Sequence, residues 1–212
     1  MSSEDEAIPT LARLLRDFVN TREPQLNAES LATSEQLRDW LAAHQLLSAD
    51  TRLSSRHLAT ALAVREGLRT ILLGHAGHSG ERTALEEYNA ALAKLPVRLA
   101  FTDGAHRLVS AHGGPAEEAL TQLVDAICRC EQDHTWHRLK VCARDTCRWA
   151  FYDASRNQTR RWCSMAGCGN HIKNKRAYAT RRTRQQQAGE ASPASRSDRG
   201  ASQRQSGALK GD

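Results

Sequence analysis

The chain of 212 residues is 40% hydrophobic and carries a formal net charge of +6, with a sequence pI of about 9.2. No stretch approaches the roughly 20 apolar residues of a membrane-spanning helix, which excludes an integral helical membrane protein. The acidic residues 1–6 lack the positive patch and apolar core of a secretory signal. We therefore expect a cytoplasmic protein of one or two domains, with reduced cysteines and no membrane partner.

The charge is distributed very unevenly along the chain. Residues 1–137 contain 13 Lys and Arg against 19 Asp and Glu, whereas residues 138–184 contain 13 against two, a net charge of +11. Aromatic residues also concentrate in the basic segment. They are Trp149, Phe151, Tyr152, Trp162 and Tyr178. Such a distribution indicates an acidic body joined to a basic module that faces a polyanion.

Apolar residues recur at helical spacing throughout the first part of the chain. We expect Ser34 to be the N-cap of the second helix, Gly74 to end the third and Pro96 to break the fourth. The helical segments are residues 11–19, 34–41, 58–72, 84–95 and 120–133.

An alternating pattern interrupts the helices. Apolar residues occupy every second position over 97–101, and Asp103-Gly104 follows directly. Asp-Gly between alternating segments is typical of a two-residue β-hairpin turn. We therefore expect residues 1–137 to form an α+β domain that is mainly helical with one β-hairpin, and that senses a signal or mediates self-association.

The pattern changes again after residue 137. Residues 138–187 predict a small module of short strands and turns, followed by a very basic helix that begins near Asn170 as its N-cap. Residues 188–212 are rich in Gln, Ser, Ala, Gly and Arg and have almost no large apolar side chain. They cannot bury enough surface to offset the entropy of ordering, so we expect a disordered tail.

Four of the six cysteines form two close pairs with the spacing C-x4-C-x15-C-x4-C. Two thiol pairs separated by a loop of this size suit tetrahedral zinc, each pair forming a knuckle around one edge of the ion. Unrelated cysteines or two disulfides are the alternatives, and the absence of a secretion signal disfavours them. Since cysteine fills all four positions, we expect one structural Zn²⁺ rather than a catalytic one. The ligands would be Cys142, Cys147, Cys163 and Cys168.

Two motifs carry a resemblance to known families. Arg160-Arg161-Trp162-Cys163 followed by Cys168-Gly169-Asn170 resembles the CGNR zinc finger, and Asp17-Phe18-Val19-Asn20-Thr21 is similar to its companion ABATE domain. The resemblance covers about residues 11–182. It implies a bacterial, stress-induced regulator of transcription whose zinc finger binds DNA. In one departure His171 stands at the final Arg of the motif, which would make a phosphate contact weaker and pH-dependent.

Basic and amide side chains of this module are candidates for nucleic-acid contacts. We expect Asn170, Lys173 and Asn174 to read base edges and the arginines to hold phosphates. The candidates are Arg156, Arg160, Arg161, Asn170, His171, Lys173, Asn174, Lys175, Arg176, Arg181 and Arg182.

Trp149, Phe151 and Trp162 could stack on bases, but we expect them to form the small core of the module, with Tyr152 more exposed. In the N-terminal domain, Asn20 and Thr21 are candidates for a ligand pocket, although a helix-end cap explains them equally well.

The function expected from the sequence is that of a zinc-dependent transcription regulator that binds double-stranded DNA, with a homodimer as a candidate assembly. RNA binding is one alternative. A protein-interaction or scaffold module, whose basic finger meets an acidic partner, is another. We do not expect an enzyme, because the sequence has no paired carboxylates, Gly-rich phosphate loop or nucleophile motif.

Overall fold

The computed structural model of the protein describes residues 7–102 and 104–190, except for the side chains of residues 102, 176 and 188–190. The chain divides into two compact units, Met1–Gly169 and Asn170–Asp212. Residues 191–212, which make up most of the expected disordered tail, lie outside the described residues.

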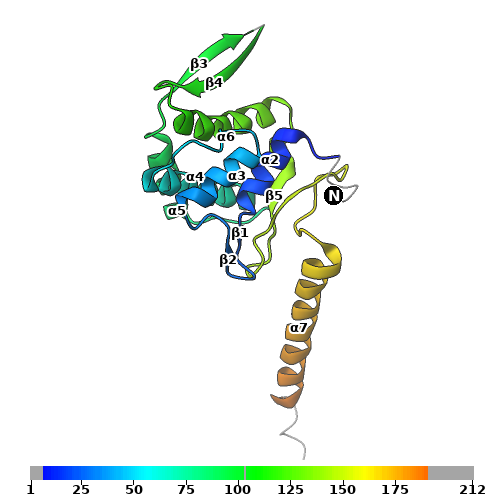
Figure 1. Ribbon diagram of the computed structural model, residues 1–212. Helices are drawn as coiled ribbons and strands as arrows, with labels where there is room; N and C mark the ends of the chain where they lie inside the picture. The colour runs from blue at the N-terminus through cyan, green and yellow to red at the C-terminus, as the bar shows by residue number, and fades with distance from the viewer. Residues whose placement is uncertain (1–6, 103, 191–212) are drawn as a thin grey trace, which may run out of the picture. The chain divides into compact units, whose positions relative to one another are not determined.

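The first unit has an α+β fold in which helices surround one core, accompanied by three small antiparallel sheets (Figure 1). Its helices are α2 (Thr10–Val19), α3 (Ser34–Ala43), α4 (Ser55–His75), α5 (Arg82–Leu92) and α6 (Pro115–Gln132). Its strands pair as β1 (Arg22–Glu23) with β2 (Ala28–Glu29), β3 (Val97–Thr102) with β4 (Ala105–Ser110), and β5 (Leu139–Val141) with β6 (Ala150–Tyr152).

Several helix ends differ from the expectation. Helices α4, α5 and α6 begin at Ser55, Arg82 and Pro115 rather than at 58, 84 and 120, and α5 ends at Leu92, before Pro96. Thr33, not Ser34, is the N-cap of α3: its hydroxyl accepts a hydrogen bond from the Gln36 amide, while the Gln36 side chain accepts one from the Thr33 amide. A capping box needs a Glu or Gln three positions after the N-cap residue, and Thr33 has Gln36 at that position. Helix α4 continues past Gly74 to His75, and the chain turns at Gly77, which has φ +77°.

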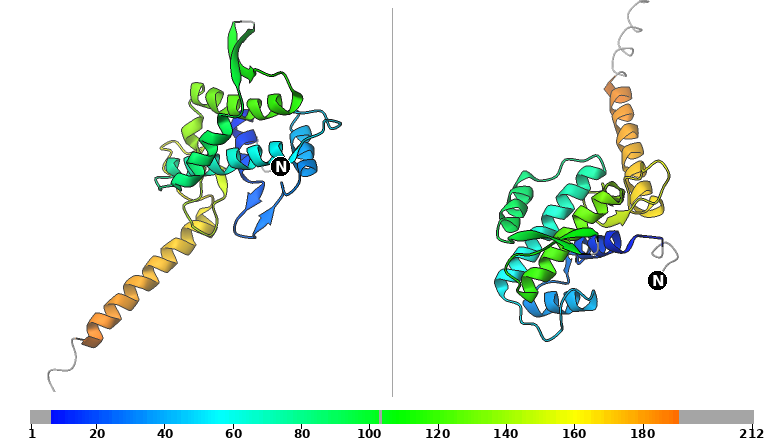
Figure 2. Two further views of the ribbon diagram at one scale, coloured as in Figure 1. Left: turned by 90° about the vertical axis from the view of Figure 1, so that its left-hand side faces the viewer. Right: turned by 90° about the horizontal axis from the view of Figure 1, so that it is seen from above.

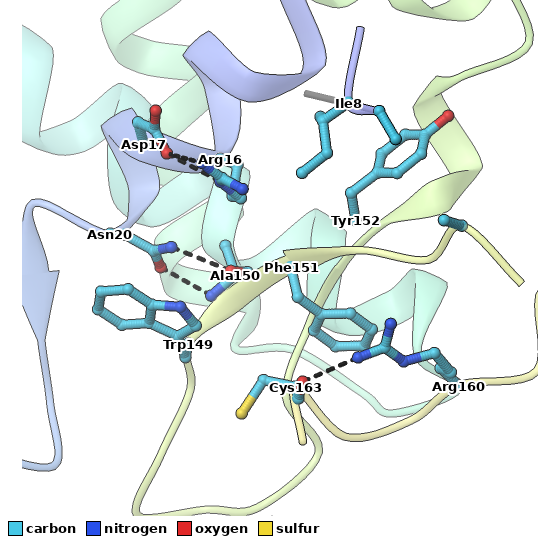
Figure 3. A pocket seen from close by; sticks show the side chains of 12 residues that line it. Ile8, Arg16, Asp17, Asn20, Trp149, Ala150, Phe151, Tyr152, Arg160 and Cys163 are labelled. Atoms are coloured by element: carbon cyan, nitrogen blue, oxygen red, sulfur yellow. Dashed lines mark hydrogen bonds and ion pairs between the residues drawn. The ribbon is translucent and has the colours of Figure 1, made fainter. Parts of the chain in front are cut away.

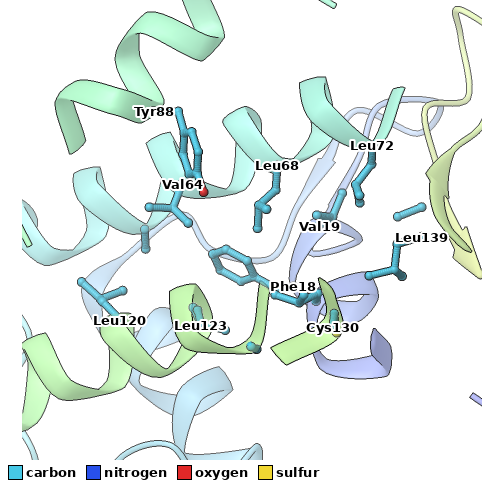
Figure 4. Close-up of a cluster of buried hydrophobic side chains, with 14 of the residues drawn as sticks. Phe18, Val19, Val64, Leu68, Leu72, Tyr88, Leu120, Leu123, Cys130 and Leu139 are labelled. Atoms are coloured by element: carbon cyan, nitrogen blue, oxygen red, sulfur yellow. The ribbon is translucent and has the colours of Figure 1, made fainter. Parts of the chain in front are cut away.

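The core forms between α2, α4 and α6 (Figure 4). Phe18 of α2 lies at its centre, with Leu68 of α4 and Leu123 of α6 around it, and none of the three is exposed to solvent. Leu139 of β5 belongs to the same cluster. The core of the N-terminal helices therefore extends into the segment that carries the cysteine motif.

The hairpin β3–β4 confirms the predicted Asp-Gly turn, because Thr102 pairs with Ala105. Strand β4 lies against α6, and β3 is the outer strand (Figures 1 and 2). The Leu108 amide donates to Asp125 of α6 over 2.7 Å, and the Ser110 amide donates to Glu118 over 2.8 Å. Two carboxylates of α6 thus cap one edge of this hairpin.

The second unit consists, in its described part, of α7 (Asn170–Glu190). None of the described helices in the chain is long and apolar enough to cross a membrane.

Candidate metal centre

The ribbon β5–β6 carries the first cysteine knuckle. Its strands pair with the register Leu139↔Tyr152, Lys140↔Phe151 and Val141↔Ala150. Directly after β5, the Cys142 amide donates to the Trp149 carbonyl over 2.8 Å, and the Cys147 amide donates to the Arg144 carbonyl over 2.9 Å. These bonds close a tight turn that brings Cys142 and Cys147 to the same side of the ribbon.

The second knuckle ends in a π-helical turn, Met165–Gly169. The Gly169 amide donates to the Ser164 carbonyl over 3.0 Å, and the Gly167 amide donates to the Ser164 hydroxyl over 3.3 Å. A Cβ on Gly169 would lie 2.7 Å from Met165 Sδ and 3.1 Å from Trp162 Cδ1. Glycine at this position therefore lets the turn close around Cys168.

This turn corrects the expected start of the basic helix. Asn170 is not an N-cap, because it directly follows the π-helical turn as the first residue of α7. Ser164 receives the side-chain hydrogen bond that an N-cap would receive. The helical segment thus starts at Met165, earlier than expected. The sequence did not reveal this start because a single π turn has no periodic pattern.

The four predicted ligands meet in one cluster. The sulfur atoms of Cys142, Cys147, Cys163 and Cys168 all lie within 4.8 Å of one another. Cys163 Sγ is 3.7 Å from Cys147 Sγ and 3.8 Å from Cys168 Sγ. A Zn–S bond of about 2.3 Å in a tetrahedral site places the sulfur atoms about 3.8 Å apart. The spacing therefore fits zinc, and the separations are far too long for disulfide bonds.

The ionisation of the thiols also fits a divalent cation. Hydrogen bonds from Cys147 and Cys163 lower the pKa of Cys142 to about 2. The hydrogen bond with Cys142 raises the pKa of Cys147 to about 11 and raises that of Cys163 still further. The thiolate of Cys142 thus opposes ionisation of Cys147 and Cys163, and a bound divalent cation would favour their thiolate forms.

A guanidinium group compensates the charge of the cluster. Arg144 Nη1 lies 3.9 Å from Cys168 Sγ, and the Nε atom of Arg144 is buried without a hydrogen-bond partner among the described residues. Four thiolates around Zn²⁺ carry a net negative charge, which this arginine would partly neutralise. The residues present therefore fit a structural zinc ion held by four cysteines, which would crosslink the two knuckles.

Aromatic side chains pack against the thiols. Trp149 and Trp162 are half-buried against the cysteine cluster, and Phe151 is buried. Trp149 and Trp162 therefore form part of the small core expected from the sequence, while Phe151 is buried but does not belong to the cysteine cluster. Tyr152 was expected to be more exposed, but it is half-buried against the main core of the first unit.

Side chains of the N-terminal helices hold the ribbon in place. Asn20, which follows α2, donates to the Ala150 carbonyl over 2.9 Å and accepts from the Ala150 amide over 2.7 Å (Figure 3). Its amide thus pairs with β6 as a further strand would. His75, at the end of α4, lies with Nδ1 2.9 Å from the Leu139 carbonyl.

Arg69 of α4 connects the helices to the first knuckle. Its buried guanidinium donates to the Val19 carbonyl over 2.6 Å and to the Arg148 carbonyl over 2.8 Å. Arg148 has φ +53°, so its carbonyl is presented from a left-handed turn of the knuckle. Sequence reasoning missed these anchors because their partners are far apart in the chain.

A buried ion pair holds the loop between the knuckles. Lys140 Nζ lies 2.9 Å from Asp153 Oδ2, and the two side chains are 5% and 0% exposed. Burial opposes ionisation of Asp153, but hydrogen bonds from Lys140, Ser155 and the Arg160 amide outweigh it and lower its pKa. Lys140 also donates to the carbonyls of Gln158 and Arg160. The pair thus fixes the chain that leads to Cys163.

A half-open pocket of about 600 Å³ lies between α2 and the ribbon (Figure 3). Asn20 lines this pocket together with Trp149, Phe151 and Arg160, while Thr21 does not. Thr21 is buried, donates to the Phe18 carbonyl over 2.7 Å and accepts from Arg65. Both candidate pocket residues therefore make structural hydrogen bonds, Asn20 to the ribbon and Thr21 at the end of α2.

The three candidate arginines of the first unit differ in their contacts. Arg160 is half-buried, donates to the Cys163 carbonyl over 2.9 Å and lies over the Phe151 ring. Arg161 is exposed and lies 2.7 Å from His78 Nε2, and Arg156 is exposed. Arg160 therefore braces the second knuckle, while Arg156 and Arg161 are accessible to a ligand.

The remaining candidates lie on α7. Their side chains are exposed, except that the side chain of Arg176 lies outside the described residues. The exposed candidates are Asn170, His171, Lys173, Asn174, Lys175, Arg181 and Arg182.

Comparisons with known families agree with this geometry. The CGNR zinc finger family matches residues 138–182, which include all four cysteines and most of α7. A second family, ABATE, described as "Putative stress-induced transcription regulator", matches residues 12–148. The search of curated proteins finds no match. Since the ABATE match covers more than half of the chain, the protein belongs to the ABATE family and carries a CGNR zinc finger.

Proposed function

We propose that the protein is a zinc-dependent regulator of transcription that binds double-stranded DNA through α7 and the adjoining zinc finger. The charge of α7 carries this proposal. Between Asn170 and Gln187 the sequence has six Lys and Arg and no Asp or Glu. They are Lys173, Lys175, Arg176, Arg181, Arg182 and Arg184. Among the described residues, no ion pair involves α7.

An unpaired basic helix is best explained by a polyanionic partner. Like charges at i, i+4 destabilise a helix by a few tenths of a kcal/mol per pair, and phosphates remove that repulsion. Between Asn170 and Gln187 the only apolar residues in the sequence are Ile172, Ala177, Tyr178 and Ala179, which is too few for an apolar stripe of the kind that docks on a protein core. The charge of α7 therefore supports a polyanionic partner, and we propose nucleic acid as that partner.

We assign different roles to the candidate residues. Asn170, Lys173 and Asn174 read base edges at the start of α7, whereas Arg181 and Arg182 contact phosphates. Arg156 and Arg161 add phosphate contacts from the finger. Arg160 positions the second knuckle rather than touching DNA, because its guanidinium is already engaged by Cys163 and Phe151.

The zinc ion is structural in this proposal, and the protein has no catalytic activity. Four cysteine ligands leave no open coordination position for water or substrate. The regulator would act in the bacterial cytoplasm under stress. It would act as a homodimer, because regulators that recognise paired half-sites commonly bind as dimers.

Binding of the zinc-loaded full chain to duplex DNA tests this proposal. Fluorescence anisotropy at increasing salt should show affinity falling steeply, because several phosphates release counterions. The double variant R181Q/R182Q should reduce the slope of log K against log salt by about 2, while R107Q on β4 should leave it unchanged. Absence of binding at low salt, or binding indifferent to salt, would refute the proposal.

Selection from random DNA then tests whether the protein reads sequence. Enrichment of a motif that Asn174→Ala relaxes supports base reading by α7. Preference for RNA in competition, or a pulldown of an acidic protein that survives nuclease treatment, would instead favour the alternative partners.

A further inference from the structure

The two edges of the β3–β4 hairpin differ in how their backbone groups are paired. On β4, the outward amides of Leu108 and Ser110 are capped by Asp125 and Glu118 of α6. Since these amides point away from β3, their cross-strand partners Leu99 and Val97 also direct their backbone groups outward, on the opposite edge. No described residue caps that second edge. The outer edge of β3 is therefore open to another strand.

The side chains at the open edge are apolar and exposed. Val97, Leu99 and Phe101 share one face of β3, and they are 41%, 51% and 74% exposed. Most exposed edge strands are protected by charged side chains, prolines or bulges. Here the pairing runs without a bulge from Val97 to Thr102, and Arg98 points to the other face. The apolar face of β3, formed by Val97, Leu99 and Phe101, thus carries no charge, proline or bulge that would oppose strand addition.

We propose that β3 is the dimerisation strand of this protein, pairing edge to edge and antiparallel with β3 of a second copy. This inference rests on the homodimer of the proposed function, but it does not depend on DNA binding. The occupant is a second copy because β3 is complementary to itself about a two-fold axis at Leu99. In that register Leu99 faces its own symmetry mate and Val97 faces Phe101 of the other copy.

Charge and backbone pairing both suit this register. Arg98 faces Ala100 of the other copy, so no like charges stand opposite each other across the new pair. Leu99, Val97 and Phe101 are the residues whose backbone groups point outward, so each facing pair can exchange both backbone hydrogen bonds. The result is a four-stranded antiparallel sheet whose outer edges are the two β4 strands, already capped by α6.

The interface is small, which sets the expected strength. Pairing one short edge strand falls at the low end of interface sizes, below about 1,200 Å². We therefore expect a reversible dimer with a dissociation constant in the range of about 1–100 μM. Sedimentation of the zinc-loaded full chain should show a concentration-dependent average mass, without DNA present.

A charge-swap pair provides the decisive test. L99K and L99E should each be monomeric up to about 1 mM, because each places two like charges directly opposite at the two-fold axis. An equimolar mixture of the two should recover a heterodimer, which a simple loss of folding or of another partner's site would not produce. R107Q, an exposed change on β4, is the matched control and should dimerise as the wild type does. Circular dichroism and zinc content should be unchanged in all variants.

The outcomes distinguish whether the protein forms a dimer from whether β3 is the strand that forms it. A wild type that stays monomeric at about 1 mM overturns both the homodimer and the role of β3. Single variants that remain dimeric show that a dimer forms elsewhere and overturn the role of β3 alone. Single variants that are monomeric but do not recover on mixing overturn the self-pairing register.

Discussion

The hairpins β3–β4 and β5–β6 differ in the length of their strands and in how far their side chains are buried. The first has six-residue strands and projects exposed apolar side chains, whereas the second has three-residue strands that lie largely in the core. Leu139, Val141 and Ala150 of β5–β6 are not exposed at all, while Leu99 and Phe101 of β3–β4 are 51% and 74% exposed. Strand length alone therefore does not determine how firmly a hairpin is held.

A hairpin of this protein is anchored by contacts from residues outside it. Asn20, Arg69 and His75 bind the backbone of β5–β6 or its knuckle, and the cysteine cluster closes its far end. For β3–β4, the carboxylates of α6 hold one edge and leave the other open. A short ribbon held by many partners can support a metal site, while a longer hairpin held on one edge presents a surface.

Removing the metal should have the largest effect on stability, and it acts on the β5–β6 side of the comparison. The variant C163S should lose zinc and lower the thermal midpoint by about 10 °C or more, because thiolate zinc contributes much of its binding energy to folding. The loss should appear in the far-ultraviolet signal of the whole first unit, since β5 shares its core. Metal analysis and circular dichroism provide the measurement, with C128S at an exposed cysteine as the control. An unchanged midpoint after chelation would contradict the structural role.

Breaking the buried ion pair should have the next largest effect. D153N should destabilise the protein by about 3 kcal/mol, because it leaves Lys140 buried without its carboxylate. Adding K140M to D153N should recover part of that loss in urea unfolding, as expected for coupled residues. Recovery of nothing would show that Asp153 acts mainly through Ser155 and the Arg160 amide.

The same pair predicts a direction for the pH dependence. The pKa of Asp153 is lowered on folding from its ordinary value of 3.8. Its stabilising contribution is therefore complete above that value and is lost as the pH falls through the lower folded pKa. The stability difference between wild type and D153N should be constant near neutral pH and shrink below pH 3.8. A difference that grew in acid would contradict this assignment.

Removing one anchor should loosen the short ribbon by a smaller amount. N20A should lower the free energy of unfolding by about 1–3 kcal/mol, because both backbone groups of Ala150 lose their partner. Hydrogen exchange at the Ala150 amide should accelerate, while N89A at an exposed helical position should change neither quantity. Unchanged exchange at Ala150 would show that the other anchors suffice.

The smallest effect is expected at the exposed hairpin. F101S should change the stability of the monomer by less than about 0.5 kcal/mol, because the ring is 74% exposed. Urea unfolding at dilute protein, below the range of self-association, measures this. A loss above about 1 kcal/mol would mean that the hairpin is held more firmly than its contacts show.

Local patterns in the sequence predicted much of the fold and the metal ligands. The Asp103-Gly104 turn, the helical segments and the four cysteines were recognisable because each has a fixed spacing in the chain. The capping of α3 was misplaced by one residue, since Thr33 and Ser34 are both good caps and only the reciprocal contact with Gln36 distinguishes them.

The anchoring of the ribbon could not be predicted in the same way. Asn20 and Ala150 are 130 positions apart, and Arg69 reaches a carbonyl 79 positions away. No periodicity links such residues, because their meeting depends on how α2 and α4 pack. Asn20 was noticed as a polar residue after a helix, but its role as a partner of β6 follows from the tertiary structure alone.

The shared core has a consequence for how the protein can be divided. A fragment ending at residue 137 would lose Leu139, Val141 and Ala150 and expose the apolar surface that they cover. A fragment beginning at residue 138 would keep the cysteines but lose Asn20 and Arg69. The two family matches, 12–148 and 138–182, also overlap across this segment. The boundary that respects the packing falls after Gly169, so the metal site and the helical domain should be produced, and should unfold, as one piece.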